Sequence, residues 1–467
     1  MFFKQYYLGC LAHGSYLLGS KGEAAVIDPQ RDVDQYIDEA KDNGLTIKYV
    51  IETHLHADFV SGHRELAERT GAQIVFGKMA AATFPHLAVT GGDTIRVGGL
   101  ELKIYETPGH TLESICILVS DTDDKNTPQR LFTGDTLFIG DVGRPDLVAG
   151  KGHTAQEMAG LMYESLQNKL LKLDDAVEVY PAHGAGSLCG KHLSDEKSST
   201  IGNEKKFNYA LKPMSKESFI AMMTADLPEV PAYFTKDVEI NRQGAAPLDS
   251  ITRPQPLNGA AVAKEMQRGS IVLDVRSAVD YAGAHIKGSL NIGLGGQFAS
   301  WAGTFIEIGT PIILLANDLA SVDEAVMRLA RVGLESVIGY VENGISGWSN
   351  SGFEAVPSLV MTVDELKRTL DKGEEMKIID VRRTGEFENG HVPNAINIPL
   401  ADLPVRINDL PAGVQLAFIC ASGYRSTMAM GIVDRSGLMP AINVVGGTSA
   451  WKAQGYEVAT EQRAVLS

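Results

Sequence analysis

The stretch THLHADFVSGH, residues 53–63, decides how the first half of the chain folds. His54 and His56 are separated by one residue, and Asp58 follows two residues later. Alternate residues in a loop can turn two imidazole rings to one point, and imidazole with carboxylate suits zinc or iron. The next residue, Phe59, has no atom that can coordinate a metal. Any proposed function has to explain why three potential metal ligands are followed by a residue that cannot coordinate a metal.

Further metal-type residues follow other apolar stretches of this half. They are His110 in TPGHT, Asp135 in FTGDT and His183 in YPAHG. We predict strands over residues 24–28, 48–52, 72–77, 100–106 and 114–119, and helices over 33–42, 61–70 and 154–170. Each candidate ligand then lies just past the carboxyl end of a strand, where loops gather side chains above a sheet. The pattern predicts a metal centre.

In order and spacing, THLHAD, TPGHT, FTGDT and YPAHG resemble the metallo-β-lactamase fold over about the first 200 residues. The resemblance implies an αββα sandwich with metal at one edge of two facing sheets. Hydrolases of this family hold two metals, and the second metal uses the Asp58 position, the residue after it and the His183 position. Phe59 removes one of these three donors, which favours a single metal.

Two histidines and one carboxylate with open positions is the facial arrangement of non-haem Fe(II) oxygenases. Among relatives of this fold, the sequence resembles the persulfide dioxygenases. That resemblance implies one Fe(2+) per chain, held by His54, His110 and Asp135. His56, Asp58 and His183 would orient ligands and water by hydrogen bonds. The sequence leaves direct ligation by His56 open.

Two features near these motifs concern the substrate. Arg144 and Asp146 resemble a Gly-Arg-x-Asp segment of the same dioxygenases; Arg144 either binds a substrate carboxylate or forms a salt bridge that braces its loop. After PAHG the chain has Ala185, where some glutathione-using relatives have tyrosine. Cys189 follows, and a small buried thiol is its default role, with substrate contact as the alternative.

The C-terminal half contains an internal repeat. Residues 271–292 match residues 377–398 at a spacing of 106, and GISGW at 344–348 matches GTSAW at 447–451. Strands alternate with helices in each copy, which predicts two α/β domains with parallel sheets. Residues 241–259 are Pro- and Gly-containing and polar, as in a linker. The expected domains are 1–245, 257–357 and 358–467.

A second reactive cluster is CASGYRS, which follows an apolar strand and leads into a helix. Its backbone amides, the helix N-terminus and Arg425 favour a thiolate at Cys420. The segment 360–460 resembles the rhodanese family, whose loop holds a sulfur. The resemblance makes Cys420 and Arg425 catalytic. The other residues of the sulfur-binding loop would be Ala421, Ser422, Gly423, Tyr424 and Ser426.

The first copy of the repeat lacks this cluster. At a spacing of 103, Cys420 maps to Asn317, Gly423 to Ala320 and Arg425 to Val322. An amide cannot carry a persulfide. We therefore expect domain 257–357 to be catalytically silent and to serve as a spacer, a docking platform or a homo-oligomer contact.

The composition of the chain limits the classes of partner and the cellular location that we expect. The net charge of −16 and the lack of a basic cluster argue against nucleic acid or an anionic membrane. The four cysteines form no CxxC pair, and no apolar run reaches the roughly 18 residues of a membrane span. Scattered cysteines suit a reducing compartment, so we expect a cytoplasmic protein.

The two chemistries fit one another. A persulfide dioxygenase converts a persulfide and O2 to sulfite, and a rhodanese can transfer sulfane sulfur to sulfite to give thiosulfate. The expected substrate is a low-molecular-weight persulfide, with glutathione persulfide as the first candidate. The alternatives are a zinc-dependent hydroxyacylglutathione-type thioester hydrolase fused to a sulfurtransferase, and a non-catalytic sulfur sensor or carrier.

Overall fold

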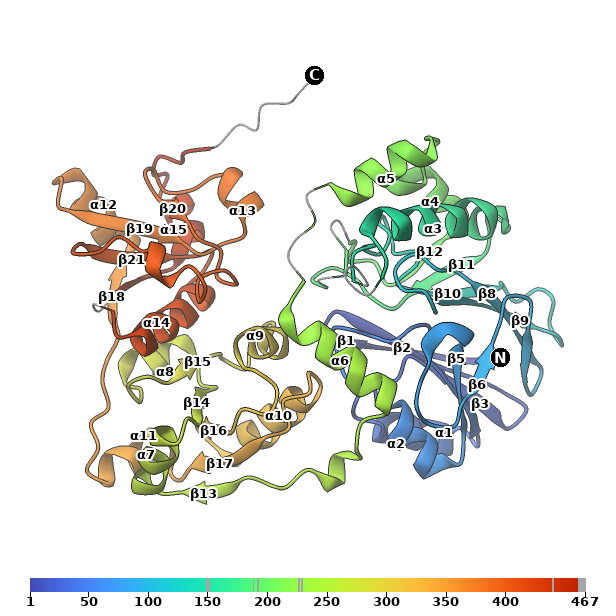
Figure 1. Cartoon of the computed structure of the whole chain (residues 1–467), viewed down its shortest axis with the longest axis horizontal. Helices are drawn as coiled ribbons and strands as arrows, with labels where there is room; N and C mark the ends of the chain where they lie inside the picture. Colours follow the sequence, from blue (N-terminus) through green and yellow to red (C-terminus); the bar gives the residue numbers. More distant parts are fainter. Residues whose placement is uncertain are drawn as a thin grey trace. The chain divides into compact units, whose positions relative to one another are not determined.

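The computed structural model describes residues 1–147, 152–187, 189–190, 193–225, 227, 230–438 and 441–460 (Figure 1). The chain divides into two compact units, one formed by Met1–Ile251 with Leu329–Gly333 and the other by Thr252–Arg328 with Leu334–Ser467. Residues 461–467 of the predicted third domain lie outside the described part. Among the described residues, no helix is long and apolar enough to cross a membrane.

The first unit contains two six-stranded sheets. The first sheet has β1 (Phe2–Leu8), β2 (His13–Ser20), β3 (Glu23–Ile27), β4 (Thr46–Ile51), β5 (Gln73–Gly77) and β6 (Leu87–Val89), in that spatial order. The second has β7 (Thr94–Val97), β8 (Leu100–Glu106), β9 (Ile115–Asp121), β10 (Arg130–Gly134), β11 (Glu178–Pro181) and β12 (Ser199–Thr200), again in sequence order. Apolar side chains of both sheets, such as Ile27, Ile104 and Phe132, form the buried core between them.

Helices cover the outer faces of both sheets. On the first sheet these are α1 (Asp34–Asp42) and α2 (His63–Thr70), whose apolar sides pack in a second buried cluster. The second sheet is covered by α3 (Ala155–Asn168), α4 (Ile201–Phe207) and α5 (Lys216–Thr224), and α6 (Ala232–Gln243) follows. This is the αββα sandwich that the sequence predicts. The predicted strands and helices coincide with β3, β4, β5, β8, β9, α1, α2 and α3 to within two residues at each end.

Strand register brings the polar loops together. In the first sheet Ile27 pairs with Ile51 in parallel strands, so the loops after β3 and β4 begin side by side. In the second sheet Gly134 pairs with Pro181, so the loops after β10 and β11 also begin together. Because parallel neighbours end at the same edge, side chains distant in sequence meet there.

The second unit contains two five-stranded parallel sheets. One consists of β13 (Gln255–Leu257), β17 (Val337–Val341), β16 (Ile312–Leu315), β14 (Ile271–Asp274) and β15 (Leu290–Asn291), in that spatial order. The other repeats the order with β18 (Leu359–Thr362), β22 (Ile442–Val445), β21 (Gln415–Ile419), β19 (Met376–Asp380) and β20 (Ile396–Asn397).

Nine named helices surround these sheets in the described residues. They are α7 (Gly259–Gln267), α8 (Ala278–Gly283), α9 (Phe298–Phe305), α10 (Leu319–Ala330), α11 (Gly344–Asn350), α12 (Val363–Asp371), α13 (Thr384–Glu388), α14 (Tyr424–Ser436) and α15 (Gly447–Ala453). The same strand order and polar contacts recur in both copies. Asp274 binds Arg276 in the first copy as Asp380 binds Arg382 in the second, through buried charge-assisted hydrogen bonds. These residues brace the scaffold.

The predicted linker over residues 241–259 is partly wrong. Helix α6 continues to Gln243, and Asn241 is buried in the first unit. At the other end, β13 pairs with β17 and is an edge strand of the next domain. Short polar segments with Pro and Gly can still form element ends when tertiary contacts satisfy their backbone groups.

Candidate functional site

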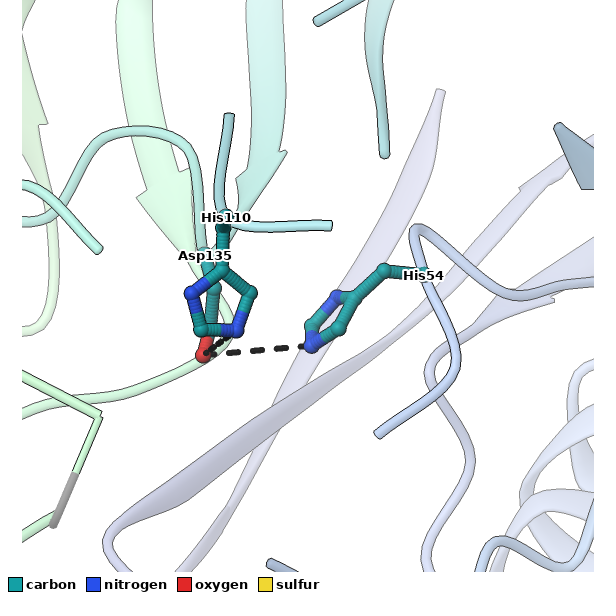
Figure 2. A group of neighbouring side chains, drawn as sticks. All are labelled: His54, His110 and Asp135. Atoms are coloured by element: carbon teal, nitrogen blue, oxygen red, sulfur yellow. Dashed lines mark ion pairs between the residues drawn. The ribbon is translucent and has the colours of Figure 1, made fainter. Parts of the chain in front are cut away.

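Three predicted ligands converge at the edge of the sandwich (Figure 2). His54 follows β4, His110 follows β8 and Asp135 follows β10. Nε2 of His54 lies 3.8 Å from Oδ2 of Asp135, and Nε2 of His110 lies 3.4 Å from the same oxygen. All three side chains are buried, and one ligand atom from each lies within 4.8 Å of the others. The group can therefore hold a metal ion.

The hydrogen bonds of the two histidines orient their lone pairs. Nδ1 of His110 lies 2.9 Å from the carbonyl oxygen of Arg144, so it donates there. The hydroxyl of Thr53 donates to Asp28 and is left to accept from Nδ1 of His54 at 3.0 Å. Each ring then presents an unprotonated Nε2 towards Asp135. Nε2 of His110 is buried and has no hydrogen-bond partner among the described residues, as expected of a metal donor.

The electrostatics suit the same role. Burial lowers the pKa of His110, and burial with the charge of nearby His56 lowers the pKa of His54 well below its ordinary value. Burial opposes ionisation of Asp135, but the neighbouring histidines, with His183 the largest contributor, outweigh it and hold its pKa well below the usual range. Two neutral imidazoles and one carboxylate are the protonation states that a metal requires.

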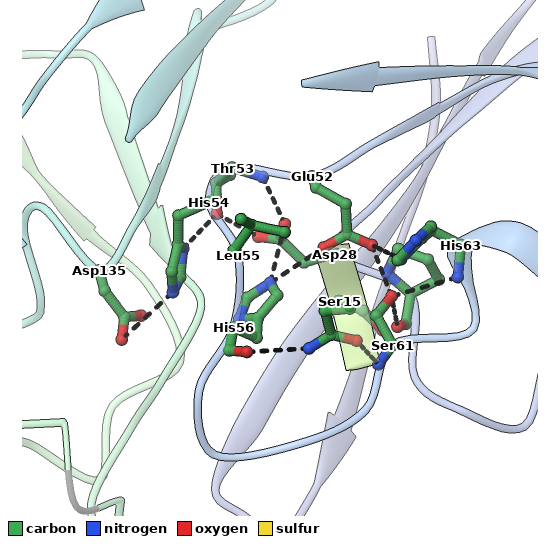
Figure 3. A network of polar contacts seen from close by, with 12 residues as sticks. Ser15, Asp28, Glu52, Thr53, His54, Leu55, His56, Ser61, His63 and Asp135 are labelled. Atoms are coloured by element: carbon green, nitrogen blue, oxygen red, sulfur yellow. Dashed lines mark hydrogen bonds and ion pairs between the residues drawn. The ribbon is translucent and has the colours of Figure 1, made fainter. Parts of the chain in front are cut away.

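His56 points to a different place (Figure 3). Its Nε2 lies 3.2 Å from Oδ1 of Asp28 and 3.2 Å from Oε2 of Glu52. Asp28 follows β3 and Glu52 follows β4, so both carboxylates come from the ends of neighbouring strands. Burial disfavours a charged imidazole, but the two carboxylates outweigh it and raise the pKa of His56 to about 10. His56 is thus an imidazolium whose Nε2 faces two acids, rather than a member of the His54 cluster.

His183 and Asp58 connect to the cluster through Asp135. Nδ1 of His183 lies 2.9 Å from Oδ1 of Asp135, and its Nε2 lies 2.9 Å from Oδ2 of Asp58. Burial opposes charge on this ring, but Asp135 and Asp58 raise its pKa well above the ordinary value. His183 therefore orients Asp135 by a charge-assisted hydrogen bond.

Cys189 lies beside this pair, within 4.8 Å of ligand atoms of Asp58 and His183. Burial and the negative charge of Asp58 raise the pKa of Cys189 to about 12, so it stays a thiol. Arg144 makes a bidentate ion pair with Asp146, at 2.7 and 2.8 Å, which is the bracing arrangement considered above. Substrate binding by Arg144 or Asp146 stays a prediction.

His13 is a buried residue of this site that the sequence reasoning missed. It begins β2 and pairs with His183 in an isolated bridge, and its ring lies tilted against that of Phe59, with the centroids 4.1 Å apart. Neither ring nitrogen has a hydrogen-bond partner among the described residues, and burial lowers its pKa well below the ordinary value. Nothing in the local sequence HGSY marks it as part of the centre.

Asn241 was also missed, because it lies in the predicted linker. Its side-chain amide donates to the carbonyl oxygens of His56 and Phe59, at 2.8 Å each, and accepts from the amide of Ser61. Asn241 therefore holds the loop of residues 56–61 on both sides of Phe59.

Gly134 has a different local role: its φ is +51°, and a Cβ there would lie 2.4 Å from the Thr53 hydroxyl. The Asp135 loop can approach the His54 loop only with glycine at this position.

In the second unit, Cys420 follows β21 and precedes α14. The amide of Gly423 donates to its sulfur at 3.1 Å, and the hydroxyl of Ser426 lies 3.4 Å away. Gly423 has a φ of +114°, which favours glycine and turns its amide to the sulfur. Arg425 binds Glu386 of α13 through two hydrogen bonds, at 2.6 and 2.8 Å. Glu386 was not among the predicted site residues.

Strand register corrects the alignment of the two copies. Asp274 pairs with Leu315, and its counterpart Asp380 pairs with Ile419. The residue that follows the strand is therefore Ala316 in the first copy, and the equivalent of Cys420 is Ala316 rather than Asn317. Helix α10 then starts after a loop one residue shorter than the loop before α14. The first copy still lacks a nucleophile at this place.

Comparison with known proteins agrees with this architecture. Residues 8–183 match the metallo-beta-lactamase superfamily model, and residues 259–351 and 362–454 match the rhodanese-like domain. A metallo-beta-lactamase from Staphylococcus aureus is 34% identical, with a TM-score of 0.67, over 73% of this chain and 98% of that one. Persulfide dioxygenase ETHE1 of Mus musculus is 32% identical over 217 residues, which are 45% of this chain and 75% of that protein.

Other relatives have hydrolase names. A hydroxyacylglutathione hydrolase of Anaeromyxobacter dehalogenans is 32% identical over 170 residues, 36% of this chain and 60% of that protein. The match to two beta-lactamase hydrolase-like proteins of Xylella fastidiosa, at 28% identity, spans half of their length. The chain therefore belongs to the metallo-beta-lactamase superfamily through its N-terminal part, where it is a homologue of the persulfide dioxygenase ETHE1, and carries two rhodanese-like domains after it.

Proposed function

We propose that the chain is an Fe(2+)-dependent persulfide dioxygenase coupled to a rhodanese. The first reaction is R–S–SH + O2 + H2O to R–SH + sulfite + two protons. The second is R–S–SH + sulfite to R–SH + thiosulfate. Glutathione persulfide is the first candidate for R–S–SH. The similarity to ETHE1 and the two rhodanese-like domains support this pair of reactions.

One observation carries the first reaction. His54, His110 and Asp135 converge in one group, whereas His56 is held by Asp28 and Glu52. Phe59 fills the place of the missing second-metal donor and is fully buried. The donor set is two imidazoles and one carboxylate, which fits a single Fe(2+) with open positions. A bound Fe(2+) would supply the redox chemistry for O2.

The protein residues around this centre keep their own tasks. His183 holds the carboxylate of Asp135, and the carbonyl of Arg144 holds the ring of His110. Phe59 provides apolar ring surface beside the site, and its burial limits access of water. These contacts keep the three ligand atoms in place without a second metal.

The second reaction would use Cys420. Its thiolate attacks the outer sulfur of the persulfide, R–SH leaves, and Cys420 carries the sulfur as a persulfide. Sulfite then takes that sulfur and regenerates the thiolate. The Gly423 amide and the Ser426 hydroxyl contact the sulfur and stabilise its charge.

The test is metal analysis of anaerobically purified protein together with oxygen uptake on glutathione persulfide. We expect one iron per chain, one O2 consumed per sulfite formed, and thiosulfate when persulfide is in excess. The second candidate is the thioester hydrolase, favoured by the hydroxyacylglutathione hydrolase relative. Paired zinc ions and thioester cleavage without oxygen consumption would establish that candidate instead.

A further inference from the structure

A single segment of the Cys-less domain, residues 288–296, contacts α14 of the active domain at three places. This segment, called the socket here, includes β15 and the glycine-rich turn after it. Both domains lie in the second compact unit. Because Tyr424 and Ser426 of the sulfur-binding loop lie in the first turn of α14, whatever holds this helix also holds the loop.

The first contact is at the N-terminus of α14. The phenol of Tyr424 donates to the carbonyl oxygen of Gly293 at 3.0 Å. Its ring also lies over the socket glycines, because Cβ atoms built on Gly293 and Gly296 would come within 3.7 and 3.8 Å of it. Tyr424 is the next residue after Gly423, whose amide donates to the Cys420 sulfur. The phenol therefore anchors the loop from its sulfur-binding end.

The second and third contacts are further along the helix. Gly431 lies directly on the socket, since a Cβ there would be 3.0 Å from the carbonyl oxygen of Ser289. The carboxylate of Asp434 accepts a hydrogen bond from the amide of Gly288, one turn later. Three contacts on one face fix both the rotation and the axial position of a helix.

The Cys-less domain has a cavity beside the socket, and two of its polar lining residues are already bound to other groups. A cavity of about 430 Å³ remains there, with Arg276, Asn317 and Tyr424 among its lining residues. The guanidinium of Arg276 is already bound to Asp274 and to the carbonyl of Ala284. The side-chain amide of Asn317 donates to Asp280. Tyr424 is thus the feature of this region that connects it to the sulfur chemistry.

We propose that the Cys-less domain positions the sulfur-binding loop of its active neighbour, with Tyr424 as the positioning residue and residues 288–296 as the socket. This inference rests on the proposed sulfur transfer at Cys420. Small movements of α14 change the distance between the Gly423 amide and the sulfur, and a hydrogen bond to sulfur depends steeply on that distance. The silent domain is then required for transfer although it holds no nucleophile.

The test uses the full chain and two readouts: the rate of sulfur transfer from thiosulfate to cyanide, and the half-life of the Cys420 persulfide after loading with thiosulfate, measured by mass spectrometry. Tyr424→Phe keeps the ring and removes one hydrogen bond, so transfer should fall about fivefold. Tyr424→Ala should lower it more than tenfold and shorten the persulfide half-life. Asp434→Ala, remote from the sulfur, should lower both in the same direction.

Tyr456→Phe is the matched control, because it removes a phenol hydrogen bond to Asp364 in the same domain but away from the socket. It should leave both readouts unchanged. Tyr424→Phe and Asp434→Ala variants that keep wild-type transfer and persulfide half-life, even with a lower unfolding temperature, would overturn the inference, because the socket would then contribute only stability. Wild-type protein that transfers no sulfur would instead overturn the proposed function.

Discussion

Nε2 of His56 lies 3.2 Å from the carboxylate of Glu52, and this pairing takes His56 out of the metal cluster. Asp28 contacts the same ring nitrogen at the same distance. Removal of one partner from a buried ion pair leaves an uncompensated charge, which costs far more than the pair contributes. The loop that carries His54 therefore depends on a residue outside the group of His54, His110 and Asp135.

His56→Ala should destabilise the first unit by about 3–5 kcal/mol, because Asp28 would be buried without its cation and Glu52 would keep only its contacts with His63 and Ser61. Amide hydrogen exchange of residues 46–70 measures this unit separately from the rest of the chain. His86→Ala, a half-buried histidine on the same domain, is the control and should cost less than about 1 kcal/mol. If the amides of residues 46–70 were equally protected from exchange in His56→Ala and His86→Ala, the ion pairs of His56 would not stabilise the first unit.

The same pair predicts a pH dependence of metal-free protein. Burial opposes the charge of His56, but its two carboxylates raise its pKa from 6.5 to about 10 in the folded chain. A raised pKa gives stability that is fully present below about 6.5 and is lost as the pH rises through about 10. Unfolding by urea should therefore need less denaturant at pH 10 than at pH 6, and His56→Gln should flatten this change. A wild-type profile as flat as that of the variant would contradict the pairing.

Much of the site can be predicted from the sequence, because the carboxyl ends of the strands can be located from the apolar runs. Apolar runs followed by His or Asp place His54, His110, Asp135 and His183 at one edge, and the structure gathers them there. The resemblance favours His54 over His56 as a ligand, but the sequence could not show that His56 contacts the carboxylate of Asp28. That acid is 28 residues before His56 in the chain and reaches it only through the pairing of β3 with β4.

Two other features needed tertiary structure. Asn241 lies in a polar stretch without periodicity, and only the packing of α6 shows that it holds the loop around Phe59. The repeat gave Asn317 as the counterpart of Cys420 because an ungapped spacing cannot reveal a loop shortened by one residue. Backbone pairing at Leu315 and Ile419 reveals it.

His110→Ala should remove bound iron and sulfite production while sulfur transfer from thiosulfate to cyanide remains. The imidazole supplies one of three ligand atoms, and its loss leaves a two-ligand site. Metal content by mass spectrometry and oxygen uptake are the measurements. His153→Ala is the control, because His153 is a partly exposed histidine of the same unit outside the group of His54, His110 and Asp135. Retained dioxygenase activity in His110→Ala would refute the ligand assignment.

Cys420→Ser should leave oxygen uptake intact and abolish thiosulfate formation, since a hydroxyl is a far weaker nucleophile than a thiolate. Sulfite should then accumulate in place of thiosulfate, which ion chromatography can follow. Cys10→Ser should keep both activities. A collapse of oxygen uptake in Cys420→Ser would show that the two chemistries are not separable.

Phe59→His tests the proposal that the centre takes one metal. The ring of Phe59 is buried against His13 and His56, with ring centroids 4.1 and 4.5 Å away. An imidazole there would add a nitrogen donor beside Asp58, His183 and the neutral thiol of Cys189, so zinc bound per chain should rise from one to two in equilibrium dialysis. Oxygen uptake should fall, because a second ion beside Asp135 competes for that carboxylate. Phe59→Leu changes the ring without adding a donor and should keep one metal; two metals in that variant, or in the wild type, would show that Phe59 is not what excludes the second ion.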